Sequence, residues 1–155
     1  MGTRAGAIDG NAVLRLAEVH GVAEAGRILN RESGLLGLGG ASDMRSLQRA
    51  GTVEARFAVA HFCYWAVRHA GSLIAAMGGL DAVAFTGGIG ENDRTVRGEI
   101  LRGLRWAGVE FDEAANAGGA AVLHQTGARV AIWTVPAEEE RQIAMEAMAV
   151  RAGEA

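Results

Sequence analysis

DAVAFTGGIGENDRTVR, residues 81–97, is the stretch that decides the fold. Its first part alternates Val83 and Phe85 with small residues, a pattern that predicts a short strand buried on both faces. Three glycines follow, and the segment after them has the apolar spacing of a helix. The glycines allow two interpretations, a tight strand-to-helix turn or a loop whose bare backbone lets a ligand lie against it.

The helix expected after the glycines has an apolar face and an arginine-rich remainder. Its packed face is expected to hold Val96, Ile100, Leu104 and Ala107. The arginines that fall largely off this face are Arg94, Arg97, Arg102 and Arg105.

A second unit of the same plan lies near the end of the chain. RVAIWTV, residues 129–135, predicts a strand, Pro136 turns the chain, and EEERQIAMEAMAV, residues 138–150, predicts a helix. Two successive strand-loop-helix units predict an α/β fold with ligand loops at the strand ends.

The first half of the sequence predicts helices. Residues 11–32 indicate two short helices broken at HGV, residues 33–42 with their four glycines indicate a loop, and residues 43–50 return to a helical pattern. One long helix is predicted over Val53–Met77, ended by two glycines. Its packed stripe is expected to hold Val53, Phe57, Ala60, Tyr64, Val67, Gly71 and Ile74.

The composition is that of one globular domain. The chain has 155 residues, 50% hydrophobic and 21% charged, and a formal net charge of −3 without a basic block, so nucleic acid is not an expected partner. No apolar run reaches the roughly 20 residues of a membrane span, and no secretory or lipidation signal is recognised, so we expect a cytoplasmic protein. Cys63, alone in an apolar run, is expected to be a buried, reduced thiol.

The glycine segment by itself does not select between its two interpretations. No Gly-Lys-Ser/Thr follows, so it is not a Walker loop, and it lacks the full G-x-G-x-x-G spacing of dinucleotide-binding turns.

Four separated segments together resemble the acetate kinase family in order and spacing. They are MGTRAGAID (1–9), ESGLLGLGGASDMRSL (32–47), DAVAFTGGIGENDRTVR (81–97) and VPAEEERQIA (135–144). The resemblance implies the C-terminal portion of the sugar kinase, heat-shock and actin-like (ribonuclease H-like) ATPase fold, present as one domain over residues 1–155. It also implies an enzyme that transfers the γ-phosphoryl group of ATP to acetate, giving ADP and acetyl phosphate, with Mg²⁺.

The resemblance implies roles in ATP binding, catalysis and Mg²⁺ binding for particular residues. The segment bordering adenosine is Gly88, Ile89, Gly90, Glu91 and Asn92. The segment closing the other side is Asp43, Met44 and Arg45. Arg4 would face the transferring phosphoryl group, and Glu139 would bind Mg²⁺.

Local interpretations without a ligand exist for three of these residues. Asp43 is suited to cap the helix that follows it, and Arg4, near a terminus, is suited to be solvated. Glu139 and its acidic neighbours favour the dipole at the start of a helix without any metal.

Family members are more than twice this long, so the resemblance implies that an N-terminal half with the catalytic histidine is missing. His20, His61, His69 and His124 are expected to be structural or surface residues. The first hypothesis is therefore an acetate kinase fragment, inactive alone and dimeric in its full-length form.

Three alternatives remain open. One is a fragment of a propionate or related short-chain acyl kinase, and another is an ATP-binding module without catalysis. The third is an assembly module, in which Phe62 and Trp65 form a dimer face, although burial against the sheet would also explain these aromatic residues.

Overall fold

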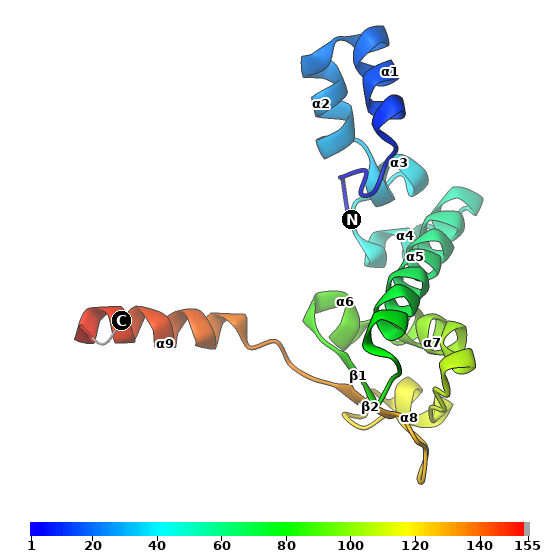
Figure 1. Cartoon of the computed structure of the whole chain (residues 1–155), viewed down its shortest axis with the longest axis vertical. Coiled ribbons are helices and arrows are strands. Elements are labelled where there is room, and N and C mark those ends of the chain that lie inside the picture. The colour runs from blue at the N-terminus through cyan, green and yellow to red at the C-terminus, as the bar shows by residue number, and fades with distance from the viewer. Residues whose placement is uncertain (154–155) are drawn as a thin grey trace. The chain divides into compact units, whose positions relative to one another are not determined.

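The structure is a computed structural model that describes residues 1–153. The chain divides into two compact units, Met1–Leu73 and the part from Ile74 onward, and each is described by itself (Figure 1). The organisation of residues 1–155 as a single domain stays a prediction.

The first unit is helical. It contains α1 (Gly10–His20), α2 (Val22–Arg31), α3 (Gly34–Gly39), α4 (Met44–Ala50) and most of α5 (Val53–Met77). The two short helices predicted around HGV are confirmed, as are α4 and the bounds of α5.

The loop predicted over residues 33–42 is wrong, because its central part forms α3. The first amides of this helix donate to the N-terminal segment of the chain, Leu35 N to Met1 O and Leu36 N to Gly2 O, each at 2.9 Å. Gly34, with φ 63°, lies so close that a Cβ would meet Met1 O at 2.3 Å. Partners 34 residues earlier in the chain therefore satisfy the start of the helix. The number of glycines in the segment does not reveal such distant partners.

The packed stripe predicted for α5 is wrong in its first part, since Phe57 and Tyr64 are 56% and 59% exposed, whereas its last member, Ile74, is buried as predicted. The buried face instead holds Ala55 and Ala58, both 0% exposed. A Cβ on Gly39 would meet the Ala58 Cβ at 2.7 Å, so α3 and α5 approach closely through small residues. The prediction followed large apolar side chains and missed a contact that small ones make possible.

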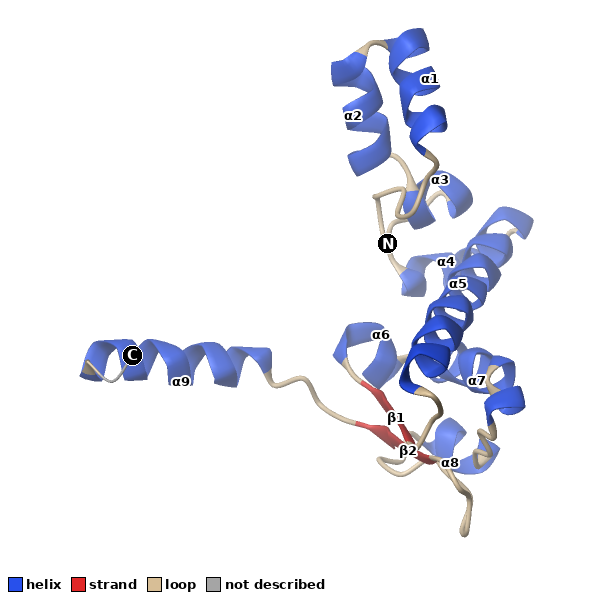
Figure 2. Ribbon diagram, in the orientation of Figure 1, coloured by secondary structure: helices blue, strands red, loops and turns tan. Residues whose placement is uncertain are grey.

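The second unit holds a small parallel sheet. Its elements are β1 (Ala82–Phe85), α6 (Gly87–Asn92), α7 (Arg94–Gly103), η1 (Arg105–Ala107), α8 (Glu113–Gly118), β2 (Ala131–Thr134) and α9 (Glu139–Ala152). The strands pair in parallel from Ala82 opposite Ala131 to Phe85 opposite Thr134 (Figure 2). Both predicted strands and the helices expected after them are confirmed.

The expectation that β1 is buried on both faces is wrong. Its residues alternate between exposed and half-buried, because the described residues of this unit cover only one face of the strand. The core lies between α7, η1, β2 and the segments around α8, and its members are Val96, Leu101, Leu104, Val109, Phe111, Leu123, Val130 and Ile132.

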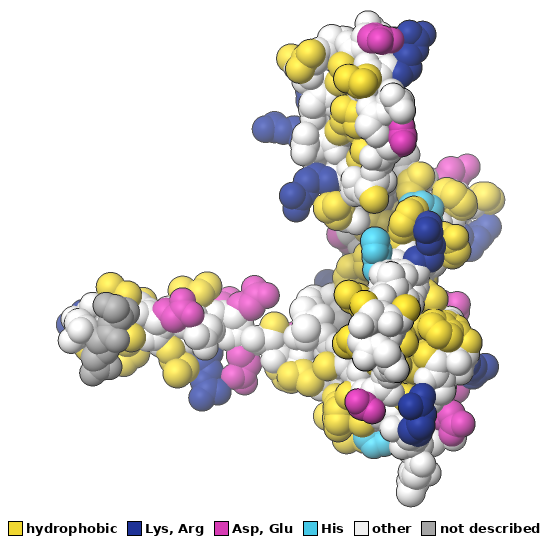
Figure 3. All heavy atoms as spheres, in the orientation of Figure 1, with side chains coloured by type: hydrophobic (Ala, Val, Ile, Leu, Met, Phe, Trp, Pro, Cys, Tyr) yellow, Lys and Arg dark blue, Asp and Glu magenta, His cyan; other side chains and the backbone are white. Residues whose placement is uncertain are grey.

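No described residue of α9 is buried, and apolar side chains such as Ile143 and Met148, 66% and 71% exposed, stand among charged ones (Figure 3). In the first unit, Cys63 is buried as predicted. None of the helices formed by residues 1–153 is long and apolar enough to cross a membrane.

Candidate functional site

The glycine segment after β1 is itself a helix. Gly87–Asn92 forms α6, with Thr86 at its N-cap and Gly87 at φ 70°, a backbone conformation that only glycine adopts without strain. The expectation of a turn or an open loop here is therefore wrong. The reason lies at the two ends of the helix, where side chains form hydrogen bonds with its backbone groups.

At the N-terminal end, the Glu91 carboxylate connects two parts of the chain. Its Oε1 accepts hydrogen bonds from the backbone N–H of Gly87 at 2.9 Å and of Ala137 at 3.0 Å. Val135 N donates to Phe85 O at 2.8 Å, which extends the parallel pairing beyond the strands. The structure thus brings α6 next to the loop that leads from β2 toward Glu139.

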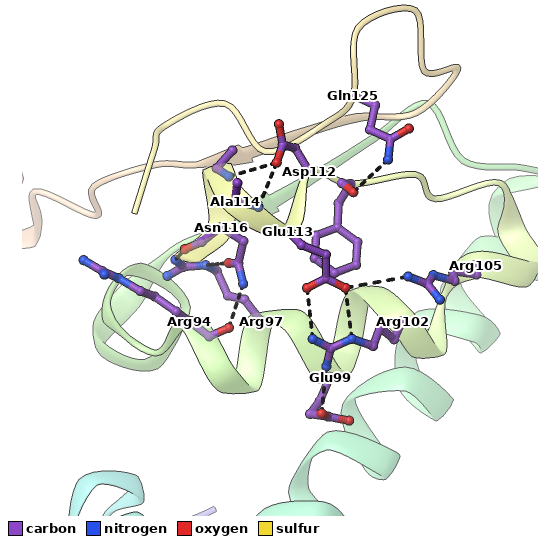
Figure 4. Close-up of polar contacts among 12 residues, drawn as sticks. Arg94, Arg97, Glu99, Arg102, Arg105, Asp112, Glu113, Ala114, Asn116 and Gln125 are labelled. Atoms are coloured by element: carbon purple, nitrogen blue, oxygen red, sulfur yellow. Dashed lines mark hydrogen bonds and ion pairs between the residues drawn. The ribbon is translucent and has the colours of Figure 1, made fainter. Parts of the chain in front are cut away.

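At the C-terminal end, the Arg97 guanidinium collects backbone carbonyls. Its Nη1 donates to Gly90 O at 2.9 Å and to Glu91 O at 2.8 Å. Its Nε donates to Asn116 Oδ1 at 3.0 Å (Figure 4). The side chain is 1% exposed, although Arg97 falls largely off the apolar face of the helix. Helical periodicity does not predict the burial of Arg97. The residue lies next to Val96 in the sequence, at the edge of the packed face.

Asn116 is a second residue that sequence reasoning missed. It is 5% exposed, and its Nδ2 donates to Arg94 O at 2.9 Å while its Oδ1 receives the bond from Arg97. One buried amide therefore joins α8 to two residues of α7 (Figure 4). Desolvation, and secondarily the charge of Arg94, lowers the pKa of the Arg97 guanidinium.

The two glycines expected to admit a flat base differ in their surroundings. A Cβ at Gly88 would meet no atom within 4 Å, so this backbone is open to an incoming group. A Cβ at Gly90 would lie 3.3 Å from the carbonyl carbon of Phe85, so packing on β1 already requires a small residue there. Asn92 uses its side-chain amide within α6, donating to Gly88 O at 3.0 Å.

In the first unit, Asp43 caps α4. Its Oδ1 accepts from the backbone N–H of Ser46 at 2.8 Å, and this bond, followed by one from the Ser46 side chain, lowers the pKa of the carboxyl group. Met44 is 4% exposed and packs inside the unit, whereas Arg45 is exposed. The capping interpretation is therefore confirmed, and a nucleotide contact by these residues stays a prediction.

Arg4 lines a cavity of about 860 Å³ within the first unit. Its neighbour Ala5 is held by a hydrogen bond from its N–H to Leu29 O at 2.8 Å. The α5 side of the cavity contains Phe62 and Trp65, both half-buried. These two aromatic residues therefore line a cavity in the helical unit with the candidate catalytic arginine.

Glu139 begins α9 and is exposed, and the residue before it has an unusual backbone conformation. Glu138 has φ 47°, the single non-glycine residue with positive φ among residues 1–153. No group of three or more His, Cys, Asp and Glu side chains comes together within these residues as a ready-made metal cluster. Any metal at Glu139 would therefore need further ligands, such as phosphate oxygens.

Comparison with known proteins identifies the family. Residues 1–145 match the sequence profile of the Acetokinase family. The chain belongs to this family. An acetate kinase of Methylocella silvestris is 43% identical over 153 residues, which are 97% of this chain and 38% of that protein. An acetate kinase of Desulforamulus reducens is 43% identical over 154 residues, 94% of this chain and 39% of that protein.

Solved acetokinase-family structures have the same fold. The acetate kinase of Porphyromonas gingivalis superposes with a TM-score of 0.87 at 33% identity, covering 97% of this chain and 40% of that one. A propionate kinase from Francisella tularensis gives a TM-score of 0.80 at 31% identity, covering 88% and 36%. The helices and small parallel sheet are thus a portion of the α/β actin-like ATPase fold, and the chain spans about 40% of these relatives' length.

Proposed function

We propose that the chain is the adenosine-side portion of an acetate kinase, in which α6 borders the adenosine of ATP and Arg4 faces the transferring phosphoryl group. The reaction is transfer of the γ-phosphoryl group to acetate, giving ADP and acetyl phosphate. The observation that carries the proposal is the position of α6 directly after β1, with Gly88 open and the Glu139 loop attached through Glu91. Ligands of α/β sheets bind at this carboxyl edge of parallel strands.

The proposed roles match the chemistry of the side chains. The guanidinium of Arg4 spreads positive charge over the oxygens of a loose phosphoryl-transfer transition state, which a lysine ammonium does less well. Glu139 offers one exposed carboxylate at the start of α9. One carboxylate together with phosphate oxygens is a usual ligand set for Mg²⁺, which would supply neutralisation of the phosphate charge.

The test restores a full-length enzyme. The 155-residue chain is co-expressed with the N-terminal portion of the Methylocella silvestris acetate kinase that the chain does not cover, and acetate-dependent ADP formation is measured. We expect turnover by the pair and none by either part alone, because in-line transfer requires all reactants to be held together. A pair in which the chain carries both Arg4→Ala and Glu139→Ala measures contaminating host kinase. Turnover at that background level in the unaltered pair, with both parts folded, would contradict the proposal.

Single substitutions in the restored pair separate the two roles. Arg4→Ala should lower kcat with little change in the KM for ATP, and Arg4→Lys should recover only part of it. Glu139→Ala should raise the Mg²⁺ concentration needed for half-maximal rate, while the same change at the neighbouring Glu140 should not. A deficit in Glu139→Ala that is independent of Mg²⁺ would return Glu139 to its helix-dipole role.

A propionate or related short-chain acyl kinase is the second candidate, favoured by the likeness to the Francisella tularensis propionate kinase. Comparing kcat/KM for acetate and propionate in one assay decides between them, provided that the partner half is taken in turn from an enzyme of each kind. Homodimerisation and a cytoplasmic location complete the proposal. ATP binding by the chain without turnover in any pair would instead favour a non-catalytic nucleotide-binding module.

A further inference from the structure

The helix α6 has an unfavourable composition for a helix. Three of its six residues are glycines, and each glycine in a helix costs roughly 1 kcal/mol relative to alanine. A helix of this length also lacks the cooperative stabilisation of longer ones. Its shape must therefore be held by groups outside its own backbone.

Two side chains of opposite charge lie at the two ends of α6. The Glu91 carboxylate accepts from the first N–H of the helix, at Gly87, and the Arg97 guanidinium donates to the carbonyls of Gly90 and Glu91 near its last residue. A negative group at the N-terminal end and a positive group at the C-terminal end both complement the helix dipole. One N–H group and two carbonyl groups at the ends of this short helix thereby gain hydrogen-bond partners.

The Arg97 side chain is also held by Asn116 of α8. Its Nε donates to Asn116 Oδ1, and Asn116 in turn donates to Arg94 O on the same helix as Arg97. The charged groups facing this region from the packed elements are Asp93, Arg94 and Glu91. Because the Arg97 side chain is 1% exposed, it cannot itself reach a ligand in solvent, and water cannot take its place on the carbonyls.

We propose that Arg97 is a positioning residue for nucleotide binding, holding Gly88–Asn92 in the helical shape that leaves the Gly88 backbone open. This inference rests on the proposed function, in which the helical shape of α6 is needed for adenosine binding. Arg97 acts through the carbonyls of Gly90 and Glu91 and not by contact with ATP.

The test uses Arg97→Met in the 155-residue chain, with Arg102→Met as the matched control. Arg102 lies on the same helix but is exposed, and pairs with Glu99 at 2.8 Å and Glu113 at 3.0 Å. Hydrogen exchange of the peptide covering residues 87–92 is measured without nucleotide, and ATP affinity by equilibrium dialysis. Circular dichroism and urea unfolding establish that each variant is folded.

We expect Arg97→Met to speed exchange in residues 87–92 by about tenfold and to weaken ATP binding by a similar factor. The reason is that the variant loses two charge-assisted hydrogen bonds to the helix. Arg97→Lys should restore part of both effects, because an ammonium can reach one carbonyl but not reproduce the fork. Arg102→Met should change both by less than about twofold. If Arg97→Met does not fold, Arg97→Lys and Asn116→Ala are compared with the control by the same two measurements.

Two results would overturn the inference. One is exchange in residues 87–92 that is no faster in the Arg97 variants than in Arg102→Met. The other is faster exchange accompanied by unchanged ATP affinity, which would make Arg97 structural only. Absence of ATP binding by the unaltered chain would count against the proposed function, and the exchange measurement, made without ATP, would then decide alone whether Arg97 holds α6.

Discussion

The carboxylate of Glu91 accepts a hydrogen bond at 3.0 Å from the backbone N–H of Ala137, a residue 46 positions later in the chain. The same oxygen accepts from Gly87 N at 2.9 Å. One side chain of the candidate adenosine segment therefore fixes the loop that precedes the candidate magnesium ligand. The proposed role of Glu91 next to a nucleotide is thus accompanied by a structural one.

Glu91→Ala should lower the free energy of unfolding by about 2 kcal/mol, since two backbone donors lose a charged acceptor. Glu91→Gln should cost less, because its amide oxygen can still accept. Urea unfolding of the 155-residue chain checks both values. The control is Glu99→Ala, whose exposed pair with Arg102 should contribute less than about 1 kcal/mol. Equal losses for the Glu91 and Glu99 variants would contradict the bridging role.

Gly88→Ala should separate stability from binding. Since a Cβ there meets nothing within 4 Å and the residue is helical, the change should raise stability by roughly 0.5–1 kcal/mol. It should nevertheless weaken ATP binding if adenosine lies against this backbone. Gly118→Ala in α8 is the matched control, being equally open, and should stabilise without affecting ATP. Unchanged ATP affinity in a folded Gly88→Ala chain would reject the adenosine assignment for this residue.

Asp43 should make stability depend on pH in the acidic range. Its folded-state pKa lies below the ordinary value of 3.8 because the ionised form accepts from Ser46 N–H, so its contribution is present above that value and is lost as pH falls through the folded pKa. The difference in urea midpoint between the unaltered chain and Asp43→Ala should therefore be largest near neutral pH and shrink on acidification. A difference that does not change with pH would show that the charge is unimportant for the cap.

Replacing Glu138 with glycine should not lower the stability of the chain. Its φ of 47° is unfavourable for a residue with a Cβ, so Glu138→Gly should be neutral or stabilising, by up to about 1 kcal/mol. Glu138→Val should destabilise, because a β-branched side chain is least compatible with this conformation. Thermal unfolding of the two variants provides the comparison. A valine variant as stable as the glycine variant would argue against a left-handed backbone at this position.

Several features could be predicted from the sequence because they depend on neighbours along the chain. The bounds of α5 follow from apolar residues at steps of three and four, ended by glycines, and the two strands follow from short apolar runs after which the chain turns. The cap at Asp43 needs only the N–H of Ser46, three residues away. Membership of the family also depended on sequence alone, through four segments in order.

The tertiary structure alone decided the features that depend on distant residues. The glycines of α3 and α6 indicate loops by propensity, yet groups outside each helix bond to its end. For α3 the partner is the distant Met1 O, and for α6 it is Arg97, which the distant Asn116 holds in place. The packed face of α5 was set by the approach of Gly39 to Ala58. Periodicity records which side chains share a face, whereas burial of a charge such as Arg97 depends on which acceptors the fold brings to it, and those acceptors lie on other elements.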